Sequence, residues 1–277
     1  METANIGFLG AGSMTEAMIE GMISQGFANP KKLMIMNRSN SQRLDELEDK
    51  YSVQTTQNTE ELLKRSNILI LAMKPLDASS ALENIQPFIT HNHLIISVLA
   101  GITTSYVEEL IGMRIPIVRA MPNTSAAIGF SATAIAPGEF ATKKHLSFAE
   151  RLFDTIGTVV HVEEEKLDAV TGVSGSGPAY FYYMVECMEK AAILNGLDEE
   201  TARSLIIQTI HGAAKMLNRT DKQASLLREQ VTSPGGTTQA GLSILEEYRY
   251  EEAVSACITA ARKRSEELGK IFEKQKE

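Results

Sequence analysis

The sequence has few of the features that mark secreted, membrane or nucleic-acid-binding proteins. Its 277 residues include only two cysteines, Cys187 and Cys257, which excludes a disulfide framework and favours a reducing, cytoplasmic compartment. The longest clean apolar run, Ile68–Met73, is far too short to cross a bilayer, and no signal peptide is expected before the strand-like Ile6–Leu9. With 27 basic against 35 acidic residues, the net charge of −8 argues against a nucleic-acid partner.

The sequence also offers little support for metal or hydrolytic chemistry. There are five histidines, and only His91 and His93 are close to each other, in a polar loop with no third ligand nearby. The Gly-x-Ser-x-Gly turn that carries a nucleophilic serine is missing. We therefore expect no bound metal and no nucleophilic hydrolysis.

Short apolar runs and amphipathic runs alternate over the first 161 residues. Such alternation predicts a parallel sheet covered by helices on both faces, as in a Rossmann-type doubly wound α/β domain. A chain of 30.3 kDa has room for two domains. The predicted strands are Asn5–Gly10, Leu33–Asn37, Ile68–Met73, Leu94–Leu99, Ile115–Met121, Ser131–Ala136 and Thr158–Val162.

Strand signals end after this region, and residues 162–277 are predicted to form an all-α domain. One of its helices, Pro178–Asn195, includes the segment Ala179–Val185, which is apolar all round. A helix without a polar face must be buried, and a domain of this size hardly has room to bury it alone. We predict that this helix packs against another subunit; the alternative is a core helix within the domain. The other predicted helices are Asp198–Asn218, Lys222–Gln230, Thr237–Tyr248 and Arg249–Lys274.

A candidate nucleotide site follows the first strand. Gly10-x-Gly12-x-x-Thr15 lies between a strand and a helix, the context that a dinucleotide fingerprint requires. The second predicted strand runs into Asn37-Arg38-Ser39, where NAD enzymes place an acidic residue. A guanidinium and a hydroxyl at this position suit a 2′-phosphate, so NADP(H) is favoured over NAD(H). The alternative for Arg38 is a solvated loop arginine.

Further loops should border the cofactor because ligands of open α/β sheets lie outside the carboxyl ends of the strands. These loops are Ala72–Pro75 and Leu99–Gly101. Lys74 could contact a phosphate or the substrate, or could simply be a loop lysine.

A second candidate site lies late in the chain, in Val231-Thr-Ser-Pro-Gly-Gly-Thr-Thr238. Ser233 is expected to cap a helix, with Pro234 at its first position and Gly235-Gly236 leaving backbone N–H groups open to a ligand. Such a helix start can bind a carboxylate, which suggests a small carboxylic acid as the substrate. Ser174–Pro178, which is also rich in glycine, is interpreted mainly as a tight entry into the buried helix.

These motifs together resemble the pyrroline-5-carboxylate reductase family. The resemblance covers essentially the whole chain, and its most specific segments are Ser174–Tyr180 and Thr232–Thr238. The other matching segments are Gly7–Met14, Asn37–Ser39, Ala72–Pro75, Arg119–Thr124 and Asp168–Thr171.

The resemblance implies an oxidoreductase of proline biosynthesis, which reduces the cyclic imine 1-pyrroline-5-carboxylate to L-proline with NADPH in the cytoplasm. It also implies a homodimer built through the helical domain, often assembled into a homodecamer. The implied substrate contacts are Glu164, Ser233, Thr237 and Thr238, with Gly236 at the helix start. The implied cofactor contacts are Leu9, Gly10, Ala11, Gly12, Ser13, Met14, Asn37, Arg38, Ser39, Asn58, Ala72, Met73, Lys74, Pro75, Leu99 and Ala100.

The roles of two residues stay open. Thr238 is expected to orient and polarise the ring nitrogen during hydride transfer, or alternatively only to cap its helix. Its hydroxyl does not titrate near neutral pH, so the proton must come with the substrate, from water or through Glu164. Glu164, for its part, could contact the substrate or belong to a solvated acidic turn.

Two other functions compete with the reductase. The first is a β-hydroxyacid dehydrogenase of similar two-part architecture, but the region Ser174–Tyr180 lacks the lysine acid that those enzymes carry. The second is a non-catalytic paralogue that binds the nucleotide, which is disfavoured because Ser233–Thr238 is intact.

Overall fold

The computed structural model describes the backbone of residues 4–274 and divides into two compact units. Unit 1 contains the described residues up to Ser176 together with those from Thr259 onward, and unit 2 contains Gly177–Ile258. Unit 1 holds the whole sheet, whereas unit 2 is helical.

Unit 1 is built on one eight-stranded sheet with the order β3-β2-β1-β4-β5-β6-β7-β8. All neighbouring strands are parallel except β6 and β7, so the expected parallel sheet is correct apart from one antiparallel pair. Only residues 122–130, which include a short 3-10 turn, separate β6 from β7, and a parallel pairing would need a longer crossover connection. The strands are β1 Ile6–Leu9, β2 Leu33–Met36, β3 Gln54–Thr56, β4 Ile68–Leu71, β5 Leu94–Ser97, β6 Ile117–Met121, β7 Ser131–Pro137 and β8 Gly157–His161.

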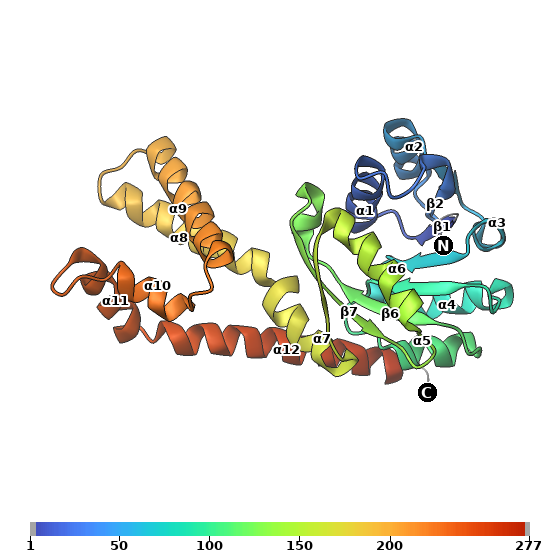
Figure 1. Ribbon diagram of the computed structural model, residues 1–277. Helices are drawn as coiled ribbons and strands as arrows, with labels where there is room; N and C mark the ends of the chain where they lie inside the picture. Colours follow the sequence, from blue (N-terminus) through green and yellow to red (C-terminus); the bar gives the residue numbers. More distant parts are fainter. Residues whose placement is uncertain (1–3, 275–277) are drawn as a thin grey trace. The chain divides into compact units, whose positions relative to one another are not determined.

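Both faces of this sheet are buried, as the continuous apolar strands predict. Phe8 and Ile70 point into one core, while Leu9 and Leu71 point into the other. Helices α1, α2 and α6 cover the first face, and α3, α4 and α5 cover the second (Figure 1). Their bounds are α1 Ser13–Ser24, α2 Ser41–Tyr51, α3 Thr59–Arg65, α4 Ala78–Ile85, α5 Thr104–Ile111 and α6 Lys143–Phe153.

The chain direction across the sheet reverses between β1 and β4. After β1 the chain moves outward through β2 and β3, and it then returns to place β4 on the other side of β1. In open α/β sheets such a switch point opens a crevice at the carboxyl ends of the strands, where ligands bind. The fold therefore positions a ligand site above Gly10 and Ala72, which directly follow β1 and β4.

Unit 2 exposes the apolar helix that the sequence singles out. In α8 the side chains of Phe181, Tyr182 and Tyr183 are 58%, 65% and 67% exposed. The alternative of a core helix within the domain is therefore wrong, and an apolar surface is left open for the predicted subunit contact. The remaining helices are α8 Gly177–Leu194, α9 Glu199–Arg219, α10 Ala224–Gln230, α11 Thr237–Glu247 and α12 Tyr250–Lys274, of which α12 begins in unit 2 and ends in unit 1.

The units divide the chain elsewhere than at the predicted boundary between residues 161 and 162. Leu167, in the short helix α7 (Leu167–Val170), is fully buried in a cluster with residues of β6 and β7. Ser265 of α12 donates a hydrogen bond of 2.6 Å to Asp168 Oδ1, which ties the end of α12 to the same region. Residues 162–176 and the end of α12 thus belong with the sheet. In the described part of the chain, no helix has the length and apolar character needed to span a membrane.

Candidate active site

A cavity of about 870 Å³ lies at the switch point of the sheet. The ends of β1, β2 and β4, the loops after them, the first turns of α2 and α3 and one side of α4 form its walls. Ten of the predicted cofactor residues line it: Leu9, Gly10, Ala11, Gly12, Asn37, Arg38, Ser39, Ala72, Met73 and Lys74. The sequence motifs and the cavity therefore coincide, while contact with a cofactor remains a prediction.

The glycine turn has the shape that a bound pyrophosphate requires. Gly10 has a φ of +120°, and a Cβ there would lie 2.5 Å from the carbonyl oxygen of Ala72, so only glycine fits. Gly12 caps α1 without a side-chain hydrogen bond, and a Cβ on Gly12 would meet nothing within 4 Å. The first N–H groups of α1 are therefore left for a ligand. Thr15, in the third fingerprint position, donates from Oγ1 to the Gly10 carbonyl at 2.9 Å and so closes the turn.

The loop after β2 presents Arg38 at the same cavity. Asn37 Oδ1 accepts hydrogen bonds from the N–H groups of Ser39 and Asn40, at 3.1 and 3.0 Å, and thereby folds the loop. Arg38 is exposed, and among the residues that the structure describes none forms an ion pair with it. Its charge is therefore available to an anion. Lys74 is exposed in the opposite wall, and its contact with a phosphate or substrate stays a prediction.

The other predicted cofactor residues lie outside the cavity wall. Asn58 caps α3 by accepting from the N–H of Glu61 at 3.1 Å, which engages its side-chain oxygen. The others are Ser13, Met14, Pro75, Leu99 and Ala100. The sequence interpretation missed ten lining residues, because no motif marks them; all but Met36, the last residue of β2, lie on helices and loops. These are Met36, Asn40, Arg43, Gln57, Thr59, Asp77, Ser80, Ala81, Asn84 and Ile85.

Glu164 lies in a hydrogen-bonded cluster within unit 1. Its Oε1 accepts from the N–H of Thr104 at 2.7 Å and from Arg119 Nη1 at 3.2 Å, and its Oε2 accepts from Thr104 Oγ1 at 2.5 Å. Its side chain is only 20% exposed and that of Arg119 only 2%, so the alternative of a solvated acidic turn is wrong. Asp168 Oδ1 lies 3.8 Å from Arg119 Nη2 and completes the cluster. Whether Glu164 also contacts a substrate remains a prediction.

The late glycine-rich segment forms a turn and then a helix start, but the cap differs from the prediction. The carbonyl of Ser233 accepts from the N–H of Gly236 at 2.9 Å, and Gly235 has a φ of +70°. Pro234-Gly235 thus occupies the centre of a tight turn, so the expectation that Ser233 caps the helix and Pro234 begins it is wrong. Gly236 is the N-cap residue of α11, and no side-chain hydrogen bond caps this helix. Among the described residues, none forms a hydrogen bond with Ser233 Oγ.

The first turn of α11 keeps donors free for an anion. In the part of the chain that the structure describes, the N–H groups of Thr237 and Thr238 have no acceptor, and both residues are exposed. The N–H of Gly235 is used, since it donates to Gln239 Oε1 at 2.6 Å. Two N–H groups, the positive end of the helix dipole and nearby hydroxyls therefore form an arrangement that suits a carboxylate.

The second specific segment, Ser174–Tyr180, starts in an irregular helical turn. Thr171–Gly175 is a π-helical turn, which places one extra residue before α8. Asn123, after β6, donates from Nδ2 to the carbonyl of Ser174 at 3.1 Å and fixes this turn. The structural interpretation of this segment fits these contacts.

The glycine turn between β1 and α1, the uncapped first turn of α11 and the cavity at the switch point of the sheet are features of an NAD(P)-dependent oxidoreductase with a Rossmann-like domain. Residues 5–101 match the family model of NADP oxidoreductases described as coenzyme F420-dependent. Residues 164–268 match the model of pyrroline-5-carboxylate reductase dimerisation, which implies self-association.

The chain belongs to the pyrroline-5-carboxylate reductase family. It is 48% identical to pyrroline-5-carboxylate reductase 2 of Bacillus subtilis and 39% identical to the reductase of Methanosarcina acetivorans. The matches cover 96% of this chain and 96% of the first relative, and 98% and 100% in the second case. A solved reductase from Coxiella burnetii has a TM-score of 0.88 at 35% identity, with 96% of this chain and 98% of that one covered. A Plasmodium falciparum reductase solved with NADP bound also reaches 0.88, at 29% identity and with 97% and 99% covered.

Proposed function

We propose that this chain reduces 1-pyrroline-5-carboxylate to L-proline with NADPH as the hydride donor, the last step of proline biosynthesis. Full-length similarity to reductases of that name supports the proposal. The observation in this structure that carries it is the first turn of α11, where two free N–H groups and the hydroxyls of Ser233, Thr237 and Thr238 stand together. That arrangement suits a small anion with a hydrogen-bonding ring nitrogen.

The substrate carboxylate binds to the N–H groups of Thr237 and Thr238, and Ser233 Oγ donates a further hydrogen bond. Gly236 presents no side chain, so the carboxylate can approach the backbone closely. The positive end of the α11 dipole adds an attraction of about 0.3–1 kcal/mol for an anion at an exposed helix start. These interactions hold the substrate by the end that does not react.

Thr238 Oγ accepts a hydrogen bond from the ring nitrogen of the protonated imine, and this orients the C=N bond. NADPH, when bound, supplies the hydride, which must reach the imine carbon over roughly 3–3.5 Å. Addition of a hydride to a protonated imine gives a neutral secondary amine, which then takes a proton from water. Both carboxylate oxygens of Glu164 already accept hydrogen bonds, so Glu164 transfers no proton in this reaction.

Selectivity for NADPH comes from Arg38 and Ser39, whose side chains are placed to bind the 2′-phosphate. The unpaired charge of Arg38 supports this assignment.

Hydride transfer to a protonated imine needs no Lewis acid, so turnover should be unchanged by EDTA.

The assembly is proposed to be a homodimer formed through α8 and the surrounding helices of unit 2, with association into decamers as the family resemblance implies. The exposed aromatic side chains of α8 support the dimer. Two unpaired cysteines, Cys187 and Cys257, support a cytoplasmic location. Light scattering coupled to gel filtration measures the assembly, and a monomer at micromolar concentration would contradict the proposed dimer.

The activity is tested by following the absorbance of NADPH with 1-pyrroline-5-carboxylate, and in parallel with a panel of 3-hydroxy acids and NADP⁺. We expect rapid oxidation of NADPH in the first assay and no reduction of NADP⁺ in the second. The reverse result would favour a β-hydroxyacid dehydrogenase. Tight NADPH binding without turnover in either assay would indicate a non-catalytic paralogue.

A further inference from the structure

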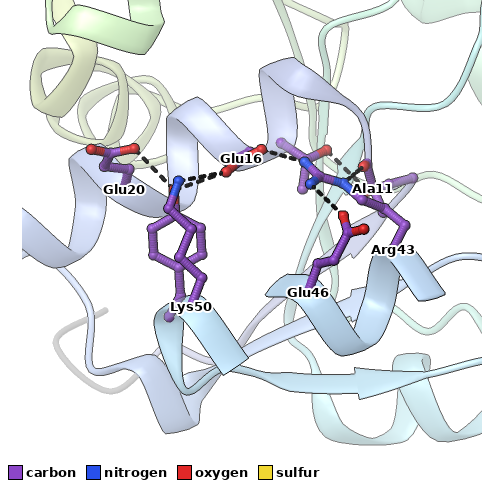
Figure 2. Close-up of polar contacts among 9 residues, drawn as sticks. Ala11, Glu16, Glu20, Arg43, Glu46 and Lys50 are labelled. Atoms are coloured by element: carbon purple, nitrogen blue, oxygen red, sulfur yellow. Dashed lines mark hydrogen bonds and ion pairs between the residues drawn. The ribbon is translucent and has the colours of Figure 1, made fainter. Parts of the chain in front are cut away.

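Arg43 is a charged residue in the wall of the dinucleotide cavity that no sequence motif marks. It lies in the first turn of α2, and its side chain, 24% exposed, reaches back to the glycine turn. Nε donates to the carbonyl of Ala11 at 3.1 Å, while Nη1 donates to Glu46 Oε2 at 3.2 Å and Nη2 donates to Glu16 Oε2. Figure 2 shows the guanidinium between these three groups. Each of its three nitrogens therefore already has an acceptor.

These contacts make Arg43 unlike Arg38, although both line the same cavity. Two carboxylates compensate the charge of Arg43, whereas no described carboxylate is paired with Arg38. A cation that is already neutralised attracts a phosphate weakly. Arg43 is thus placed to shape the site, and Arg38 is placed to bind the anion.

The hydrogen bond to Ala11 fixes the central peptide of the glycine turn. In a planar trans peptide, the carbonyl of one residue and the N–H of the next point in opposite directions. Holding the carbonyl of Ala11 therefore also sets the direction of the Gly12 N–H, one of the backbone groups at the start of α1. Because Gly12 has no side chain and is the N-cap residue, this peptide has few other restraints.

The ion pair with Glu16 serves a second purpose. Glu16 lies in the first turn of α1, so its negative charge stands close to the end of the helix that would receive the pyrophosphate. Arg43 and Lys50, which donates to Glu16 Oε1 at 2.9 Å, neutralise that charge (Figure 2). The hydrogen bond from Arg43 is also the main reason that the pKa of Glu16 is lowered to about 2, so the carboxylate stays ionised at neutral pH.

We propose that Arg43 is a positioning residue for the dinucleotide, which orients the Ala11–Gly12 peptide and neutralises Glu16 beside the pyrophosphate position. The inference rests on the proposed use of a nicotinamide dinucleotide, though not on the identity of the imine substrate. Its consequence is specific: Arg43 supports NADPH and NADH equally, since both cofactors share the pyrophosphate.

The test is a fluorescence titration of NADPH and of NADH with the full-length protein, which needs no turnover and so stays separate from the reductase assay. Arg43→Met should raise the Kd of both cofactors about tenfold and change their ratio by less than about threefold. In that background Glu16→Gln should restore a severalfold part of the affinity, whereas Glu16→Gln alone should change Kd by about twofold or less. Arg65→Met is the matched control, since Arg65 is an exposed helical arginine paired with Glu61 outside the cavity wall.

Three results would overturn the inference. A loss confined to NADPH would make Arg43 a ligand of the 2′-phosphate, and unchanged affinity for both cofactors would leave it without a role. If Glu16→Gln recovers no affinity in the Arg43→Met background, neutralising Glu16 is not part of the role of Arg43. If Arg43→Met does not fold, Arg43→Lys replaces it in the titration, because a lysine keeps the charge but cannot bridge all three acceptors. This variant should raise the Kd of NADPH and the Kd of NADH by the same factor.

Discussion

Arg119 and Glu164 form an ion pair of 3.2 Å although they lie 45 residues apart in the chain. Arg119 is on β6 and almost fully buried, and Glu164 comes from the turn before α7. The Nε and Nη2 of Arg119 have no hydrogen-bond acceptor among the described residues, so Glu164 is the main partner of Arg119. The pair therefore fastens the segment after β8 to the sheet.

Replacing Glu164 by Gln should destabilise the protein by about 2–4 kcal/mol, because the buried guanidinium of Arg119 loses the nearer of its two carboxylate partners and keeps only Asp168, at 3.8 Å. Urea unfolding at pH 7 measures the effect. The neighbouring Glu163, which is exposed, supplies the control: Glu163→Gln should change stability by less than about 0.5 kcal/mol. A Glu164→Gln variant with unchanged stability and only a higher KM would show that Glu164 serves the substrate and not the fold.

Arg38 should determine the choice of cofactor. Arg38→Met is expected to raise the KM for NADPH about 10- to 100-fold while leaving that for NADH nearly unchanged, since only NADPH carries the 2′-phosphate. Steady-state kinetics with each cofactor at saturating substrate give the ratio. Equal losses with both cofactors would contradict the assignment, because they would indicate a contact to the shared part of the molecule.

Thr238 is expected to act on turnover and not on cofactor binding. Thr238→Ala should lower kcat by about 10- to 1000-fold, and Thr238→Ser should recover most of it, because serine keeps the hydroxyl. The Kd of NADPH should not change in either variant. Ser243→Ala, on the same helix, is the control, since that hydroxyl donates only to the backbone of its own helix. Full turnover in Thr238→Ala at saturating substrate would leave the Thr238 hydroxyl without a role in the reaction.

Glu16 should make a contribution to stability that depends on pH. Hydrogen bonds from Arg43 and then Lys50 lower its pKa from 4.5 to about 2, so the folded state binds fewer protons than the unfolded state in acid. The stabilisation, roughly 1–2 kcal/mol for this partly exposed group, is complete above about pH 4.5 and disappears as the pH falls towards 2.

Chemical unfolding of the wild type and Glu16→Gln at pH 7 and pH 3.5 tests this. The difference in unfolding free energy between the two proteins should be smaller at pH 3.5. Asp45→Asn, on the exposed side of α2, should show no such trend. A difference that stays the same at both pH values would mean that the carboxylate charge of Glu16 does not contribute.

Much of the fold could be predicted because its strands are apolar and its turns contain glycine. The prediction for β1 places it within one residue at each end, and Gly10 and Gly12 mark the cavity correctly. The strand β3 was missed because Gln54–Thr56 is polar and only three residues long. The neighbouring strand β2, which pairs with β3, is apolar throughout, a pattern that β3 lacks.

Other features depend on contacts between distant residues, which local patterns do not record. The antiparallel β7 follows from the short connection after β6, and the burial of Glu164 follows from a strand 45 residues earlier. The wrong cap at Ser233 has a different cause, since Ser-Pro-Gly-Gly suits both a helix start and a tight turn. The contacts of Arg43 could not be predicted because two of its three acceptors, Ala11 and Glu16, belong to the glycine turn and α1.

The central claim is that a hydride passes from the nicotinamide to the imine carbon of a substrate held by the first turn of α11. NADPH carrying deuterium at the transferred position of C4, incubated with 1-pyrroline-5-carboxylate and the full-length protein, tests it most directly. Mass spectrometry and NMR should find one deuterium in the L-proline formed, on the ring carbon next to nitrogen that does not bear the carboxylate. Proline without deuterium, or no proline at all, would contradict the account.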